Sequence, residues 1–331
     1  MKKVAIGVDI GGTNTAIGVV DDFGNVMVKD NITTPSHGDV DRYIDDLTLA
    51  IRELINSVKL LNPDIEIMGI GIGAPQGNYY AGTIEHAANL SFKGIVPLVK
   101  LLKLKFPELP AIALTNDANA ATIGEMIYGG AKGMKNFVMY ALGTGVGSGI
   151  VVNGDLVYGQ DGFAGECGHT VLIPDGRMCG CGTPGHLEAY CSAPGMCRTA
   201  FELMVKYNAT DSLLADKSFI ELDSKMIFDA AEKGDKVALE VFEQTGKWLG
   251  QGLADTAHHL SPEAIFLFGG PTAAGDYIFK PTKESMEAHL LPTFKNKTQI
   301  LPSKLKQGDA AIVGASALVY KEIEKLQHTG N

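Results

Sequence analysis

Apolar segments and short polar turns alternate at the start of the chain. Residues 4–8 are largely apolar and predict a buried strand that ends at Asp9. A polar turn at 10–14 contains two glycines, and apolar segments follow at 15–20 and 26–28. The pattern predicts three consecutive strands joined by short turns, with a carboxylate at the end of the first strand.

The same arrangement returns more than a hundred residues later. An apolar segment at 137–142 is followed by a glycine-rich turn at 143–149 and by a second apolar segment at 150–152. In both copies a Gly-Thr pair precedes a Val-Val pair: Gly12-Thr13 before Val19-Val20, and Gly143-Thr144 before Val151-Val152. Repetition over this distance predicts two similarly built domains.

The segments between and after the two copies alternate between helical and strand periodicity. Helices are predicted over 41–61, 119–128 and 237–260, and strands over 68–73, 111–114 and 264–268. Alternation of this kind produces mixed sheets flanked by helices, which is an α/β fold. We therefore expect two α/β domains, with the ligand site in the cleft between them.

The glycine-rich turns at 10–14 and 143–149 fit either of two roles. As plain hairpin turns, they would use glycine to adopt positive φ angles. As binding turns, they would offer backbone amides to a polyphosphate. Each turn is followed by a strand, which argues against dinucleotide-binding and P-loop motifs, whose glycines open a helix. The presence of two matched turns favours the binding role.

Two carboxylates follow predicted strands. A charge at the position of Asp9 is costly to bury, so we expect it either to handle a cation or to cap the turn after it. Asn116 and Asp117 lie between a predicted strand and a predicted helix. Either residue is suited to capping the helix. Alternatively, the Asp117 carboxylate accepts a proton from a substrate hydroxyl, as phosphoryl transfer requires.

Four potential metal ligands fall within residues 169–186: His169, Cys179, Cys181 and His186. Tetrahedral zinc prefers four nitrogen or sulfur donors, and the glycines between these residues allow a short loop to fold tightly around one ion. The alternative is a chance grouping in a surface loop. A Cys-x-Cys pair flanked by glycines has little packing value in a helix or strand, so we predict that residues 169–186 form a zinc loop.

Two glutamates lie close to this zinc loop. Glu166 is three residues before His169, and Glu188 is two residues after His186. A loop clamped by a metal can hold polar groups rigidly against a ligand that is rich in hydroxyls. Otherwise both are ordinary surface carboxylates.

Composition narrows the classes of function. The length of 331 residues suits two domains, and the net charge of −10 argues against a nucleic-acid-binding surface. Five cysteines, of which two are assigned to a metal, indicate a reducing compartment. No apolar run is long enough to cross a membrane, and we expect a cytoplasmic protein that does not bind membranes.

The segments Asp9–Asn14, Asn116–Asn119 and Leu142–Gly145, together with the zinc loop, resemble the ROK family of sugar kinases and repressors. The resemblance covers almost the whole chain. It implies an α/β fold of two actin-like (RNase H-like) domains with mixed sheets around an interdomain cleft, as in hexokinases and the wider ASKHA group. The smaller N-terminal domain would comprise residues 1–115 and about 312–331. The larger domain, 116–311, would carry the zinc loop and a dimer surface.

The resemblance also implies a hexose kinase that uses ATP and Mg²⁺, holds a structural zinc ion, and forms homodimers or homotetramers. Asp117 matches the general base. Sugar-binding positions match Gly73, Asn89, Asn116, Asp117, Glu166, His169 and Glu188. Nucleotide-binding positions match Asp9, Gly11, Gly12, Thr13, Asn14, Thr144, Gly145, Gly269 and Gly270. The zinc ligands match His169, Cys179, Cys181 and His186.

Two features depart from the family pattern. The last zinc ligand is usually cysteine in the family but is His186 here, and imidazole is also an acceptable ligand. The loop 84–90 lacks the proline that often precedes the asparagine at the position of Asn89. The choice of sugar depends on the geometry of this loop and of the region around Gly73.

Glucose, phosphorylated at O6, is the expected acceptor. N-acetylmannosamine and N-acetylglucosamine are the alternatives, with mannose and fructose also open. A non-catalytic, sugar-responsive regulator would not need every one of the predicted catalytic and nucleotide-binding residues. The family's DNA-binding repressors carry an additional N-terminal helix-turn-helix, and a first strand beginning near residue 4 leaves no room for one.

Overall fold

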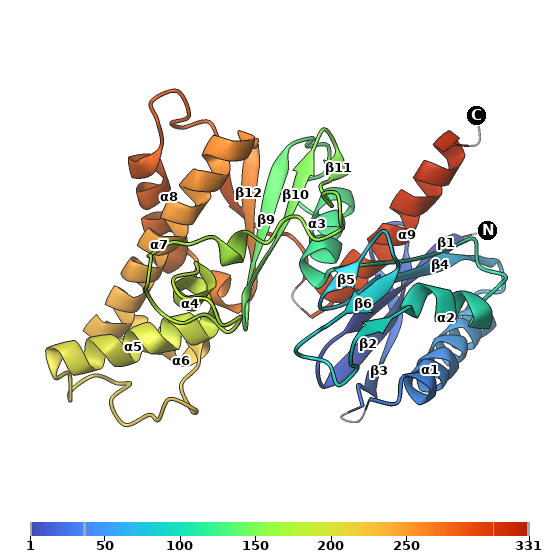
Figure 1. Ribbon diagram of the computed structural model, residues 1–331, viewed down its shortest axis with the longest axis horizontal. Coiled ribbons are helices and arrows are strands. Elements are labelled where there is room, and N and C mark those ends of the chain that lie inside the picture. The colour runs from blue at the N-terminus through green and yellow to red at the C-terminus, as the bar shows by residue number, and fades with distance from the viewer. Residues whose placement is uncertain (1, 36–37, 307, 330–331) are drawn as a thin grey trace. The chain divides into compact units, whose positions relative to one another are not determined.

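The computed structural model describes residues 2–35, 38–306 and 308–329. Internal contacts divide the chain into two compact units (Figure 1). Unit 1 contains Met1–Gly133, Leu156–Ala164 and Lys304–Asn331, and unit 2 contains Met134–Asp155 and Gly165–Ser303. Among the described residues, no helix has both the length and the apolar character needed to span a bilayer.

Unit 1 is built on a five-stranded mixed sheet with the order β3-β2-β1-β4-β8. The first three strands are antiparallel neighbours, whereas β1, β4 and β8 run parallel. The strands are β1 (Lys2–Ile10), β2 (Asn14–Asp21), β3 (Val26–Thr33), β4 (Ile65–Gly73) and β8 (Ala111–Thr115). A small second sheet contains β5 (Gly77–Asn78), β6 (Thr83–Glu85) and β7 (Ile95–Val96).

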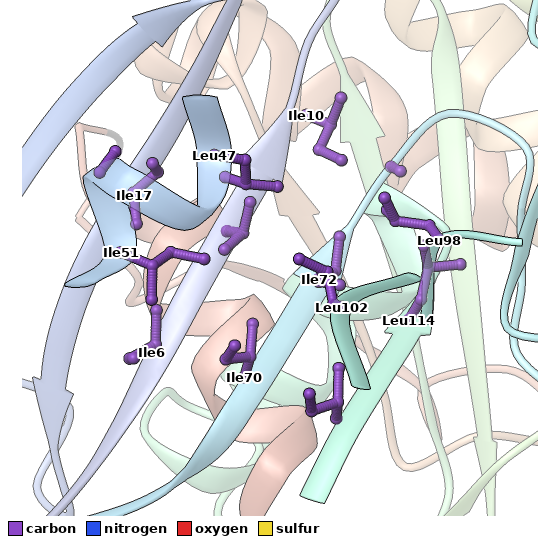
Figure 2. Packing of buried hydrophobic residues seen from close by; sticks show 14 of the residues in the cluster. Ile6, Ile10, Ile17, Leu47, Ile51, Ile70, Ile72, Leu98, Leu102 and Leu114 are labelled. Atoms are coloured by element: carbon purple, nitrogen blue, oxygen red, sulfur yellow. The ribbon is translucent and has the colours of Figure 1, made fainter. Parts of the chain in front are cut away.

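One face of the unit 1 sheet packs against α1 (Val40–Leu61) and α2 (Leu98–Lys105). Alternate residues of each strand point to this face, as the two-residue period of a strand requires. Figure 2 shows the resulting layer of aliphatic side chains, in which Ile6 and Ile70 from the sheet share a core with Leu47 from α1. Burial of these side chains supplies the main driving force for folding of the unit.

The opposite face of the sheet packs against α9 (Ala310–Thr329) and α3 (Asp117–Ile127). Glycine allows this helix to approach closely. A Cβ atom on Gly7 would lie 1.9 Å from the Ile312 carbonyl oxygen, and one on Gly71 would lie 1.8 Å from the Ala315 carbonyl oxygen. A larger residue at either position would push the helix away from the sheet.

Unit 2 has a second five-stranded sheet, with the order β11-β10-β9-β12-β13. Its strands are β9 (Phe137–Leu142), β10 (Val146–Val152), β11 (Asp155–Leu156), β12 (Ala264–Phe268) and β13 (Gln299–Pro302). Side chains of α7 (Lys236–Leu260) and α8 (Asp276–His289) pack against this sheet. A further core joins α7 and α8 to α5 (Ala193–Tyr207) and α6 (Ser224–Ala231).

The two sheets have equivalent topologies. In each, the first strand pairs antiparallel with the hairpin partner that follows it and parallel with a later strand. The predicted repeat of two similarly built α/β domains is thus confirmed. The predicted turn at 143–149 is too long, however, because Val146–Val152 already form β10. Gly147 and Gly149 alternate with Val146, Ser148 and Ile150 within this strand, so these glycines lie in a strand and not in a turn.

The division into units differs from the predicted boundary at residue 115. Helix α3 and the segment that follows it group with unit 1, because α3 packs against α9 and lies close to β4. Gly124 permits this packing, since a Cβ at that position would lie 2.8 Å from the Gly314 Cα. Unit 1 also includes Leu156–Ala164. Its final segment begins at Lys304, whereas the prediction began that segment at about residue 312.

Candidate active site and zinc loop

Three parallel strands of unit 1 end side by side and bring predicted site residues together. Asp9 of β1 pairs with Gly73 of β4, and Gly73 pairs with Thr115 of β8. A Cβ atom on Gly73 would lie 3.8 Å from Asp9 Oδ1 and 3.6 Å from the Cα of Asp117. Asp9 and Asp117 therefore lie on either side of Gly73, at the carboxyl edge of the sheet, which is the usual position of ligand sites in α/β proteins.

Both carboxyl groups hold their protons more tightly than usual. Desolvation raises the pKa of Asp9 to about 6, and the nearby negative charge of Asp117 contributes to the rise. Desolvation also raises the pKa of Asp117, against the opposing effect of a hydrogen bond donated by the Ala118 N–H. Two like-charged carboxylates in one partly desolvated place favour the binding of a cation or a proton.

Asn116 begins helix α3 as its N-cap. Its side-chain Oδ1 accepts hydrogen bonds from the N–H groups of Ala118, at 2.8 Å, and Asn119, at 3.4 Å. The capping role considered for this segment is thus taken by Asn116, which leaves its amide NH₂ group for other partners. Asp117 is the first residue of the helix; part of its surface reaches solvent, while the surrounding residues desolvate its carboxyl group.

The turn between β1 and β2 presents Gly12, Thr13 and Asn14 to solvent. A Cβ on Gly12 would lie only 2.6 Å from the main-chain oxygen of Asn89, so the predicted sugar-facing loop packs directly on this turn. Gly11 closes the turn through a 3.0 Å hydrogen bond from its N–H to the Asn14 carbonyl. The turn and the loop form one surface of unit 1.

In unit 2, the equivalent turn joins β9 to β10 and exposes Thr144. A Cβ on Gly145 would lie 2.4 Å from Glu188 Oε2. The described glycines of the two turns (Gly11, Gly12, Gly143 and Gly145) do not adopt positive φ angles. Close approach of neighbouring groups accounts for Gly11, Gly12 and Gly145 better than turn conformation does, whereas a Cβ on Gly143 would meet open space.

Gly269 and Gly270 follow β12 in unit 2. Gly269 has a φ of 107° and precedes the short helix η2 (Gly270–Ala274). A Cβ on Gly269 would lie 2.0 Å from the Leu142 carbonyl oxygen, at the end of β9. Gly269 is therefore required both by its backbone conformation and by its contact with the strand that leads into the turn at Thr144.

The zinc loop gathers its four predicted ligands into a compact four-ligand cluster (His169, Cys179, Cys181 and His186), with one ligand atom from each residue and all four atoms within 4.8 Å of one another. The two His Nδ1 atoms are 3.3 Å apart, Cys181 Sγ is 3.3 Å from His186 Nδ1, and Cys179 Sγ is 3.8 Å from His169 Nδ1. Tetrahedral zinc bonds imply about 3.3 Å between nitrogens and about 3.6 Å between nitrogen and sulfur. The cluster fits a zinc ion.

Two glutamates contact the four-ligand cluster. Glu166 Oε2 lies 3.9 Å from His169 Nε2, on the side of the ring opposite the cluster. Glu188 accepts a hydrogen bond from Cys179 Sγ at 3.2 Å and another from the Val146 N–H at 3.0 Å. Burial, with a contribution from the Glu188 hydrogen bond, raises the pKa of the Cys179 thiol to about 12. Metal binding at Cys179 must therefore displace a proton.

Each unit thus assembles part of the predicted site. In unit 1, Asp9, Gly73, Asn116 and Asp117 meet at the sheet edge, and Asn89 packs on the turn at Gly12. In unit 2, Glu188 connects the four-ligand cluster to the turn at Gly145. Sequence reasoning placed Glu188 beside the zinc loop but missed its hydrogen bond to the turn, because Val146 and Glu188 are far apart in sequence.

Comparison with known proteins agrees with this architecture. The model of the ROK family matches residues 5–322. The chain belongs to the ROK family. It is 35% identical to a glucokinase of Halalkalibacterium halodurans, with 98% of this chain and 97% of that protein covered. It is 32% identical to a glucokinase of Thermotoga maritima, with 97% and 99% covered.

A solved structure shares the fold of this ROK protein. The structure of a ROK family glucokinase from Streptomyces griseus in complex with glucose and AMPPNP matches with a TM-score of 0.78 and 32% sequence identity. The match covers 96% of this chain and 99% of that one. The prediction of a hexokinase-type α/β fold is confirmed.

Proposed function

We propose that this ROK protein is an ATP-dependent hexose kinase that transfers the γ-phosphoryl group of ATP to O6 of glucose, with Asp117 as the general base. The observation that carries the proposal is the placement of Asp117 and Asp9 on either side of Gly73 at the carboxyl edge of the unit 1 sheet. The similarity to glucokinases and to a structure holding glucose and AMPPNP supports the same function.

Both units would supply groups that bind the sugar. In unit 1 these are Gly73, Asn89, Asn116 and Asp117. Because Oδ1 of Asn116 caps α3, its amide NH₂ group would donate to a sugar hydroxyl. In unit 2 the sugar-binding groups would be Glu166, His169 and Glu188, which the zinc loop holds close to one another. Several fixed donors and acceptors are what a ligand rich in hydroxyls requires.

The nucleotide would contact the two exposed turns. Backbone amides of Gly11, Gly12, Thr13 and Asn14 in unit 1, with Thr144 and Gly145 in unit 2, would bind phosphate oxygens. Gly269 and Gly270 would contact the adenosine portion, where glycine lets the backbone approach. Asp9 would face the Mg²⁺ that accompanies ATP, and Mg²⁺ neutralises charge on the phosphates in such reactions.

The four-ligand cluster would hold a structural zinc ion. Four nitrogen and sulfur ligands leave no open position, as is typical of structural rather than catalytic zinc. His169 would present Nδ1 to the metal and Nε2 to the sugar and Glu166, so the metal would fix the orientation of the imidazole ring.

The chemical step rests on Asp117. Its raised pKa makes the ionised carboxylate a stronger base than an ordinary aspartate. As O6 attacks the γ-phosphorus and the bond to the bridging oxygen of ADP breaks, Asp117 receives the hydroxyl proton. Asn116 holds the sugar in place for this transfer. Exclusion of water would protect ATP from hydrolysis.

The central test replaces Asp117 with asparagine. Asp117→Asn keeps the shape of the side chain but removes its basicity, so we expect kcat for glucose phosphorylation to fall by about 10²-fold or more. Asp46→Asn, an exposed carboxylate change on α1, is the matched control and should leave kcat unchanged. Near-normal turnover in Asp117→Asn would show that this residue serves only the start of helix α3.

Sugar selectivity is tested by a kinetic panel. We expect kcat/KM for glucose to exceed that for mannose, fructose, N-acetylglucosamine and N-acetylmannosamine. A higher kcat/KM for either N-acetylated hexosamine would reassign the substrate while keeping the kinase mechanism.

We also propose that the protein forms homodimers or homotetramers and acts in the cytoplasm, where ATP and reduced thiols are available. Light scattering of the purified protein tests the oligomeric state.

A further inference from the structure

Arg177 lies in the zinc loop, two residues before Cys179, and only 8% of its side-chain surface is exposed. An arginine remains charged at all relevant pH values, so burial requires that its donors and its charge find partners. The mechanism proposed above gives Arg177 no role. Its contacts nevertheless connect the zinc loop with three helices of unit 2.

The guanidinium group is bound from several directions. It forms a two-point ion pair with Glu202 of α5, in which Arg177 Nε lies 3.1 Å from Glu202 Oε1 and Nη2 contacts Oε2. Arg177 Nη1 donates to Thr199 Oγ1 at 3.0 Å and faces the carbonyl oxygens of Gly195 and Ala189 at 3.4 and 3.5 Å. Paired hydrogen bonds of this kind fix the plane of a guanidinium group.

Aromatic rings cover the same group. The Arg177 Cζ atom is 4.8 Å from the centre of the Tyr190 ring and 5.0 Å from that of the Trp248 ring. The Tyr190 hydroxyl also accepts a 2.7 Å hydrogen bond from the Arg177 main-chain N–H, and the Arg177 carbonyl accepts one from Gly185. Arg177 is thus bound through both its side chain and its backbone, and lysine would reproduce only part of this.

These contacts converge on helix α4 (Glu188–Cys191), which is only four residues long. Its first residue, Glu188, contacts Cys179 and the Val146 N–H, and its next two residues, Ala189 and Tyr190, contact Arg177. A helix this short has little stability of its own. Its position relative to the zinc loop therefore depends on tertiary contacts, of which those of Arg177 are prominent.

We propose that Arg177 is a positioning residue that holds the zinc loop and helix α4 in register, so that the four-ligand cluster is assembled before zinc binds and Glu188 is placed for the sugar. The role in sugar binding rests on the function proposed above. The role in metal binding does not, because it concerns only contacts within unit 2. Arg177 acts through Glu188 and the loop, since its side chain contacts residues of α4, α5 and α7.

The test combines metal affinity with steady-state kinetics for Arg177→Lys in the full chain. Lysine keeps the charge but loses the paired hydrogen bonds and the planar stacking. We expect the dissociation constant for zinc, measured by competition with a chelator, to rise about tenfold. KM for glucose should rise to a similar extent, whereas kcat and KM for ATP should change less than about threefold. Excess zinc should lower KM for glucose toward the wild-type value.

Arg42→Lys is the matched control, because Arg42 is an exposed arginine on α1 of unit 1. It should change zinc affinity and KM for glucose by less than about twofold. Glu202→Gln perturbs the Arg177 ion pair at its exposed end and should shift the same two quantities by about threefold without unfolding the chain. If Arg177→Lys does not fold, the zinc affinity and the KM for glucose of Glu202→Gln test the proposal.

Unchanged zinc affinity and unchanged KM for glucose in a folded Arg177→Lys protein, with only a lower Tm, would overturn the proposal and leave Arg177 as a packing residue. The same holds for an unaffected Glu202→Gln protein if Arg177→Lys is unfolded. If the wild-type protein binds zinc but phosphorylates no hexose, the proposed function fails, and the zinc measurement still tests the positioning role.

Discussion

The sheets of unit 1 and unit 2 share one strand order but differ in the chemistry at the end of their first strands. In unit 1 the residue before the last position of β1 is Asp9, and in unit 2 the equivalent position of β9 is Ala141. Unit 1 therefore places a carboxylate with a raised pKa, that of Asp9, at the end of its first strand, where unit 2 has an alanine. The same scaffold carries Asp9 and Asp117 close together in one copy and a loop with four potential metal ligands in the other.

The two turns also differ in what packs on their glycines. Gly12 of unit 1 faces the main-chain oxygen of Asn89, whereas Gly145 of unit 2 faces the end of the Glu188 side chain. A backbone oxygen cannot move without its loop, but a glutamate carboxylate can rotate aside. The turn of unit 1 is therefore held by a stiff neighbour, and the turn of unit 2 by one that can yield.

This contrast predicts unequal effects of the same substitution. Gly12→Ala should displace the loop that carries Asn89, and we expect kcat/KM for glucose to fall by about 10²-fold, since misplacement of about 1 Å has effects of that size. Gly145→Ala should displace only the Glu188 carboxylate, with a fall of about tenfold. Steady-state kinetics of both variants, with glucose and with ATP varied in turn, measure the difference.

Gly133→Ala, which places a methyl group in open space at a positive φ angle, controls for the strain of adding a Cβ to a glycine. It should lower Tm without altering either KM. Equal effects of Gly12→Ala and Gly145→Ala on glucose kinetics would contradict the distinction between a stiff and a yielding neighbour.

Removal of the proposed zinc ion should act through the zinc loop of unit 2. Chelation, or Cys179→Ser, should raise KM for glucose by about tenfold, because His169 and Glu188 lose their fixed orientation. KM for ATP should change less, since most of the proposed phosphate contacts do not involve the zinc loop. Metal analysis of the protein before and after dialysis accompanies the kinetics. Full sugar affinity in the metal-free protein would show that zinc stabilises the loop without affecting sugar binding.

The fall of kcat/KM at acidic pH should follow the ionisation of the carboxyl groups of unit 1. As the proposed base, Asp117 has to be ionised to accept a proton, and the pKa values of Asp117 and Asp9 are both raised. Activity is therefore complete above these raised values and is lost as the pH falls through them, with kcat/KM falling about tenfold per pH unit for one essential ionisation. A profile of kcat/KM against pH with its acidic midpoint near 4 would show that neither group is perturbed in the free enzyme.

The smallest expected effect concerns stability. The pKa of Asp9 is about 6 in the folded protein and 3.8 as its ordinary value, so the folded state loses stability as the pH rises through this window. Asp9→Asn should therefore stabilise the protein at pH 7 by on the order of 1–3 kcal/mol while lowering activity. Urea denaturation at pH 7 and at pH 4 measures the gain, which should vanish at the lower pH.

Much of this architecture could be predicted from the sequence. The apolar segments gave β9 and β12 with correct bounds, and the repeated Gly-Thr and Val-Val pairs identified the duplication. The spacing of His169, Cys179, Cys181 and His186 predicted their convergence. Local patterns of this kind are visible because the residues that create them are close in sequence.

The remaining features depend on contacts between distant segments. The packing of α3 on α9, which moves the unit boundary past residue 115, arises from the close approach of Gly124 and Gly314. The burial of Arg177 depends on α5 and α7, and the contact of Gly12 with Asn89 depends on a loop more than seventy residues away. Such contacts leave no periodic trace in the sequence.

The cap at the start of α3 gives the proposed sugar contact a direction. The side-chain Oδ1 of Asn116 already accepts hydrogen bonds from main-chain N–H groups. A sugar hydroxyl that meets this side chain therefore has to accept a hydrogen bond from its NH₂ group. That hydroxyl keeps its own hydrogen for another neighbour, such as the carboxylate of the next residue. A deoxyfluoro sugar, whose fluorine accepts hydrogen bonds weakly and never donates them, would separate the hydrogen bond accepted from Asn116 from the one donated to Asp117.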